Sequence, residues 1–113
     1  MWGAPVETRI DSVRGHSNDD QMGFMYILLC ADGTFYTGST RDLRIRLNQH
    51  ASGVGAEYTS RRLPVTLVYY EMLERVDDAF AREKQVQQWH RSKKRALVRE
   101  GPGVRPGPDD YPF

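Results

Sequence analysis

Three short apolar stretches along the chain have the composition of β-strands. Phe24–Cys30 is apolar at successive positions, so it should be an inner strand or one covered by a helix. An Asp32-Gly33 turn signal links it to Thr34–Gly38, and this combination is the strongest short-range indication of a β-hairpin. A third stretch, Val65–Met72, is rich in β-branched and aromatic residues and predicts a third strand.

Hydrophobic spacing predicts a helix directly after the hairpin. Leu43 and Leu47 lie four residues apart and should face the core from a helix over about 41–51. Ser39 or Thr40 is the expected cap, because either hydroxyl can accept a hydrogen bond from the free backbone N–H groups of the first turn. Residues 57–62 fit either a short helix or a loop.

Two further helices are predicted in the C-terminal part. The first has its cap at Asp77 or Asp78 and runs to about His90, with a stripe at helical spacing formed by Val76, Ala79, Phe80, Glu83 and Val86. Ser92 is the expected cap of a short basic helix over 93–99. The order strand, strand, helix, strand, helix, helix predicts an α+β fold, a small three-stranded antiparallel sheet flanked by helices.

The 113 residues suit one domain, which we place at 23–100. Residues 1–22 should form a flexible N-terminal arm, and the Pro/Gly-rich residues 101–113 a tail that forms no packed element. Hydrophobic residues are 39% and charged residues 27% of the chain, which is typical of globular rather than disordered or membrane proteins. The single cysteine, Cys30, excludes an internal disulfide and a cysteine-rich zinc site. Since there is also no signal-peptide pattern, we expect a cytoplasmic protein.

Basic charge gathers in two segments although the net charge is only +1. Residues 41–62 carry five basic and two acidic residues, a net +3, and residues 82–99 carry seven and one, a net +6. Clustered basic charge is expected of a protein that contacts phosphate backbones, but a solvated charged surface gives the same pattern. The candidate nucleic-acid contacts in these segments are Arg41, Arg44, Arg61, Arg62, Lys84, Lys93 and Lys94.

Five residues are candidates for chemistry. Tyr26 and Tyr36 lie on paired strands, and Arg46 and His50 lie four apart on one helix. Glu83 is a carboxylate on an apolar stripe, where it needs a partner or a metal ion. Each also has a structural explanation: tyrosines that pack at a sheet surface, a surface arginine beside a partly buried histidine, and an ion pair of Glu83 with Arg46 or a lysine.

As a set, these residues resemble the GIY-YIG nuclease domain, and most closely its small stand-alone bacterial members of the UPF0213 type. The resemblance spans about 23–99 and is carried by Tyr26, Tyr36-Thr37-Gly38, Arg46, His50 and the glutamate of Ala81-Arg82-Glu83-Lys84. Phe24-Met25-Tyr26 stands in place of the Gly-Ile-Tyr of the name motif, and Thr37 in place of its isoleucine. Gly38 ends its strand where the backbone needs room.

The resemblance implies a divalent-metal-dependent endonuclease that acts on DNA, or on RNA or branched nucleic acid, by structure rather than by sequence. It implies that Glu83 holds one Mg²⁺ or Mn²⁺, that Arg46 braces the scissile phosphate, and that Tyr36 accepts a proton from the attacking water. Tyr26 and His50 would orient water, base or phosphate. The alternatives are a nucleic-acid-binding module that acts with a protein partner and lacks catalysis, and a small interaction protein whose partner covers the basic face.

Overall fold

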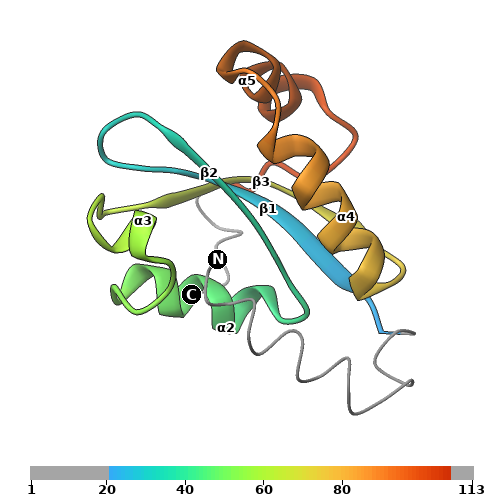
Figure 1. Ribbon diagram of the computed structural model, residues 1–113, viewed down its shortest axis with the longest axis horizontal. Helices are drawn as coiled ribbons and strands as arrows, with labels where there is room; N and C mark the ends of the chain where they lie inside the picture. Colours follow the sequence, from blue (N-terminus) through green and yellow to red (C-terminus); the bar gives the residue numbers. More distant parts are fainter. Residues whose placement is uncertain (1–20, 108–113) are drawn as a thin grey trace.

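The computed structural model describes residues 21–107, so nearly all of the predicted arm and the end of the predicted tail lie outside the described residues. A three-stranded antiparallel sheet forms the centre of the molecule (Figure 1). Helices α2 (Leu43–Ala51) and α3 (Glu57–Ser60) lie on one side of the sheet, and α4 (Val76–Gln87) and α5 (Arg91–Glu100) lie on the other. This arrangement confirms the predicted α+β fold.

The sheet has the strand order β2-β1-β3. β1 (Gly23–Leu29) is the central strand, as its apolar residues on both faces predict, and it pairs antiparallel with β2 (Phe35–Thr40) and β3 (Thr66–Leu73). The predicted hairpin is confirmed. Its turn places Gly33 at a φ of 86°, in the left-handed region that glycine adopts without steric cost.

The predicted cap of α2 is wrong. Ser39 and Thr40 extend β2, because their backbones continue to pair with β1. Asp42 caps the helix instead, and its carboxylate accepts the backbone N–H of Ile45 at 3.0 Å. Strand pairing therefore takes precedence over the local capping preference of the two hydroxyl residues.

The two C-terminal helices begin earlier than predicted. Arg75 occupies the N-cap position of α4, so Asp77 and Asp78 lie in its first turn, where their negative charge complements the helix dipole. His90 occupies the N-cap position of α5, and Ser92 therefore lies inside that helix. Within the described residues, no helix has the length and apolar character required to cross a bilayer.

Each face of β1 contributes to a different core. On one face, under α4 and α5, the buried cluster consists of Met25, Ile27, Tyr69, Val86 and Leu97. On the other face, under α2, it consists of Tyr26, Leu28, Leu43, Leu47 and Leu67. The core positions predicted on α2 and α4 are buried, which confirms them, except for Phe80 on α4, which is 43% exposed.

Residues 101–107 pack against β3, contrary to the prediction that the tail forms no packed element. Val104 forms an isolated antiparallel bridge with Tyr70, with N–H to carbonyl distances of 2.8 and 3.0 Å. The backbone N–H of Gly103 donates to the Tyr69 hydroxyl at 2.8 Å. Backbone pairing of this kind needs no apolar pattern, so composition does not reveal it.

Candidate active site

The two strand tyrosines lie on the same face of the hairpin, the face that α2 covers. β1 and β2 pair Tyr26 with Gly38 and Leu28 with Tyr36, so the two tyrosine side chains are diagonal neighbours. Their ring centroids are 6.4 Å apart. Gly38 makes room for this arrangement, because a Cβ at that position would lie 2.5 Å from the Tyr26 hydroxyl oxygen.

His50 lies behind Tyr26 and is fully buried. Burial, aided by the charge of Arg46, lowers the pKa of His50 to about 3, so the imidazole is neutral. Its Nδ1 is 2.8 Å from the Thr59 hydroxyl, which itself donates to the carbonyl of Ala56 at 3.0 Å. Nδ1 therefore carries the imidazole proton, and Nε2 accepts a hydrogen bond from the Tyr26 hydroxyl, with the two atoms 2.8 Å apart. This series of hydrogen bonds fixes the direction of the Tyr26 hydroxyl.

Arg46 brings positive charge to both phenols. It is buried, and its Nη1 donates to Gln49 Oε1 at 2.8 Å. Burial raises the pKa of Tyr36 to about 12 and also raises the pKa of Tyr26, and Arg46 acts against both shifts. At neutral pH both phenols are therefore protonated in the chain by itself, and Tyr36 becomes a base only where further positive charge gathers beside it.

Glu83 approaches β2 from the other face of the sheet. It is 1% exposed, and its carboxylate accepts the Ser39 hydroxyl at 2.5 Å and the Gln87 amide at 2.7 Å. Gln87 also donates to the Thr37 carbonyl at 3.2 Å, which ties α4 to the strand. Burial raises the pKa of Glu83, while the hydrogen bonds and the charges of Lys84 and Arg46 lower it. The ion pair anticipated for Glu83 is not formed among the described residues.

The candidate site wraps around β2, the edge strand. Tyr36 and Gly38 face α2, and Ser39 faces α4, yet the charges of Arg46 and Glu83 each influence the pKa of both phenols. The structure therefore brings four of the predicted residues together on one face of the hairpin, namely Tyr26, Tyr36, Arg46 and His50. Glu83 reaches the same strand from the opposite face.

Glu83 has the properties of a ligand for one hard cation. Within the described part of the chain, no group of three or more His, Cys, Asp or Glu residues could hold a metal ion. Because Glu83 is 1% exposed and both its carboxylate oxygens accept hydrogen bonds, a hydrated cation such as Mg²⁺ would have to displace Ser39 or Gln87 to bind it. The hydrogen bonds to this carboxylate come from neutral donors, and the buried Thr37 hydroxyl on the same strand has no hydrogen-bond partner among the described residues. This donor set fits Mg²⁺ or Mn²⁺.

The predicted nucleic-acid contacts lie on both sides of the sheet. Arg41 and Arg44 are at the start of α2, and Arg61 and Arg62 follow α3. On the other side, Lys84 is on α4, and α5 carries Lys93 and Lys94. The exposed members are Arg44, Arg61 and Lys93, and the others are partly buried. These residues do not share one helix or one face.

Sequence reasoning missed the residues that hold the predicted ones in place. Ser39, predicted as a helix cap, binds Glu83 instead. Gln87 lies four residues after Glu83, so helical spacing alone could have placed the two side chains together. Thr59 binds His50 across a turn and a connecting loop, and no local pattern indicates that contact.

Comparisons with known proteins show which sequences and structures this chain is similar to. A model of the GIY-YIG catalytic domain matches residues 22–96. UPF0213 proteins of Staphylococcus aureus strains Mu3 and Mu50 are each 44% identical to this chain over 77 residues, which cover 68% of this chain and 94% of the relative. The solution NMR structure of a UPF0213 protein from Bacillus halodurans is 38% identical, covers 80% of this chain and 93% of its own, and superposes with a TM-score of 0.49.

Proposed function

This chain belongs to the GIY-YIG catalytic domain family, a family of nucleases, and we propose that it is an endonuclease that hydrolyses DNA phosphodiester bonds with one bound Mg²⁺ or Mn²⁺. The observation that carries the proposal is the group of side chains around β2. Two phenols and a guanidinium lie on one face of the hairpin, and a buried carboxylate without a cationic partner among the described residues reaches its edge strand.

In this proposal Arg46 binds the scissile phosphate, because a planar guanidinium matches two phosphate oxygens and stabilises the charge that grows on them in the transition state. Tyr36 would first lose its own proton to solvent, and the phenolate would then hydrogen-bond the attacking water and accept its proton. Since burial raises the pKa of Tyr36 to about 12, this step depends on positive charge beside the phenol, and Arg46 supplies part of it.

Glu83 holds the cation, which when bound supplies Lewis-acid stabilisation of the phosphate and of the leaving oxygen. Ser39 and Gln87 keep the carboxylate directed at β2. On the other face, the His50 imidazole accepts a hydrogen bond from the Tyr26 hydroxyl and thereby orients the phenol, so His50 is a positioning residue rather than a proton donor.

Selection by structure rather than by sequence follows from the kind of contacts available. The exposed basic side chains on α2, after α3 and on α5 suit phosphate oxygens, and phosphate contacts carry no sequence information directly. Raised salt should weaken binding steeply, because such contacts release counterions.

A nucleic-acid-binding module without catalysis is the second candidate. The raised pKa of Tyr36 and the enclosure of Glu83 favour it, because both groups must change state before a phosphodiester bond can break. Cleavage itself distinguishes the two candidates, since a binding module needs the basic side chains but neither phenol nor carboxylate.

The test is incubation of the full chain with flap, branched, duplex and single-stranded DNA and RNA in Mg²⁺ or Mn²⁺, with and without EDTA. We expect cleavage that requires the cation and falls about 100-fold or more in Glu83→Ala and Arg46→Ala, with the exposed Glu100→Ala as matched control. Full cleavage by Glu83→Ala would remove the metal role. Binding of DNA without cleavage by the unmodified chain would favour the second candidate.

A further inference from the structure

A series of stacked planar groups leads from Tyr36 toward the tip of the hairpin. The ring of Tyr58, on α3, is stacked with the ring of Tyr36, with centroids 6.0 Å apart and an interplanar angle of 25°. The guanidinium of Arg62 lies over the Tyr58 ring, with its Cζ 3.7 Å from the ring centroid. The proposed catalytic phenol is thus linked by two stacking contacts to a cationic plane at the hairpin turn.

Arg62 is held in place by the turn itself. Its Nε donates to Asp32 Oδ2 at 2.9 Å, and its Nη1 donates to the Tyr58 carbonyl at 2.9 Å. The backbone carbonyl of Arg62 accepts the N–H of Ala31 at 2.9 Å, and the Tyr58 hydroxyl donates to the Thr34 hydroxyl at 2.8 Å. A plane fixed in this way loses little conformational entropy when a ligand stacks on it.

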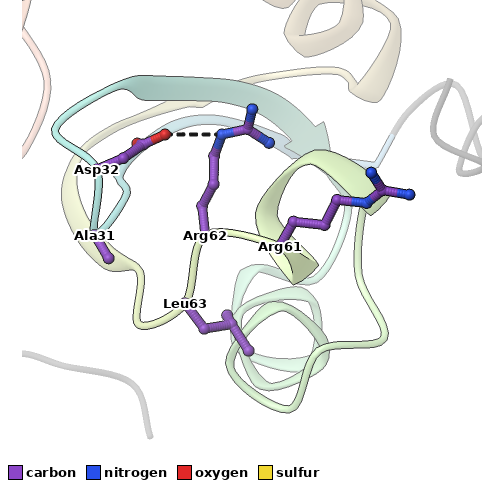
Figure 2. Close-up of a pocket in the computed structure, with 5 residues that line it drawn as sticks. All are labelled: Ala31, Asp32, Arg61, Arg62 and Leu63. Atoms are coloured by element: carbon purple, nitrogen blue, oxygen red, sulfur yellow. Dashed lines mark hydrogen bonds and ion pairs between the residues drawn. The ribbon is translucent and has the colours of Figure 1, made fainter.

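An open pocket of about 420 Å³ adjoins this plane, and Figure 2 shows the residues that line it: Ala31, Asp32, Arg61, Arg62 and Leu63. Its volume lies within the range of sites that hold one small ligand. Arg61 extends away from the Asp32–Arg62 pair (Figure 2) and is exposed. Its ion pair with Glu57 is also exposed and therefore weak, so the Arg61 guanidinium is available to a phosphate.

We propose that this pocket binds one unpaired nucleotide of the substrate strand, with its base stacked on the Arg62 guanidinium and its phosphate contacted by Arg61. Guanidinium planes and aromatic rings are the groups on which unstacked bases are bound. The inference rests on the proposed function and deepens it. The substrate is DNA with a single-stranded segment within a few nucleotides of the cleaved bond, because a fully paired duplex offers no free base to the pocket.

The test measures binding of the full chain to labelled DNA in EDTA at low salt, so that cleavage plays no part. An abasic nucleotide is moved stepwise along a single strand, and a duplex of equal length is the reference. We expect an abasic nucleotide at one or two positions to weaken binding about tenfold, and duplex binding to be insensitive to the same change.

Arg62→Lys keeps the charge but removes the plane, so it should lower single-strand affinity about tenfold and abolish the sensitivity to abasic positions. Arg75→Lys, at the exposed N-cap arginine of α4, is the matched control and should leave both unchanged. If no abasic position matters to the unmodified chain, the pocket proposal is overturned even where cleavage is observed. If the chain binds no oligonucleotide at low salt, the proposed function fails first. Should Arg62→Lys unfold, the abasic series on the unmodified chain still decides.

Discussion

Two buried carboxylates, Glu71 on β3 and Glu83 on α4, lie between α4 and the same face of the sheet, near its opposite edges, and they differ in their partners. In the register of the sheet, Met25 pairs with Ser39 on β2 and with Glu71 on β3, so these positions form one row. At the β3 end, Glu71 accepts the Nε and Nη2 of Arg82 at 2.9 and 3.1 Å and the Tyr69 hydroxyl at 2.7 Å. At the β2 end, Glu83 has neutral donors.

The difference separates an acid that the fold accounts for, Glu71, from the proposed metal ligand, Glu83. Arg82 and Glu83 are adjacent on α4, yet the Arg82 guanidinium forms its ion pair with Glu71. Buried charges are almost always paired in folded proteins, so Glu71 is accounted for by the fold, whereas Glu83 is not. Glu83 has no ion pair with a basic side chain among the described residues, which is why we propose that it binds a metal cation from solution.

The largest expected effect is on cleavage. Glu83→Gln keeps the shape of the side chain but removes the charge, so DNA cleavage in Mg²⁺ should fall about 100-fold or more while DNA binding in EDTA is unchanged. Glu71→Gln, at the other end of the row, should leave cleavage per folded molecule within a few fold. Equal losses in the two variants would remove the distinction.

The second effect is on stability, in the opposite order. Glu71→Gln leaves Arg82 partly buried without its anionic partner, and the free energy of unfolding should fall by about 2 kcal/mol, less than for a fully buried pair. Urea unfolding at pH 7 measures this, with Glu100→Gln as an exposed control. An unchanged unfolding midpoint would show that the pair contributes nothing.

A third buried group that can titrate, His50, lies on the α2 face of the sheet. Its titration should make the free energy of unfolding depend on pH in the acid range. Because the folded-state pKa is about 3 and the unfolded value about 6.5, the neutral imidazole contributes stability above pH 6.5 that is lost as the pH falls toward 3. Between the two pKa values the loss approaches about 1.4 kcal/mol per pH unit. Urea unfolding at several pH values should show this slope in the unmodified chain and in His90→Gln, whose histidine is exposed, but a smaller slope in His50→Gln.

The smallest expected effect is on the stability of the chain when the charge of Glu83 is removed. Since its folded-state pKa is raised, the ionised carboxylate costs stability as the pH rises through that pKa, and the cost is absent below the unfolded pKa of 4.5. Glu83→Gln should therefore be more stable than the unmodified chain at pH 7, with the gap closing near pH 4. Thermal unfolding at the two pH values tests this, and a variant that is less stable at pH 7 would contradict it.

The sequence predicted the fold because its signals are local. The Asp32-Gly33 turn and the apolar run of β1 are complete within a few residues, and the structure has both. The helix starts were misplaced where tertiary structure overrides a local preference, as at Ser39, which strand pairing holds in β2. The packing of the tail was missed because the bridge at Val104 is made by backbone atoms.

The identity of the candidate site residues came from the resemblance, but their chemical state did not. The pKa of Tyr36 depends on how deeply the ring is buried, and spacing along the chain does not encode that depth. Which imidazole nitrogen of His50 carries the proton is decided by Thr59 and, through it, by the Ala56 carbonyl. Contacts of this kind exist only after the chain has folded.

The two edge strands of the sheet, β2 and β3, differ in how far their outer backbone is covered. The bridge at Val104 covers part of the outer side of β3, whereas β2 has no strand beside it within the described residues. An exposed edge strand can pair through its free backbone N–H and C=O groups with a strand from another molecule. A second copy of this chain that docked there by strand addition would lie beside the strand that carries Tyr36 and Ser39, so self-association along β2 would compete with the proposed binding of a substrate strand.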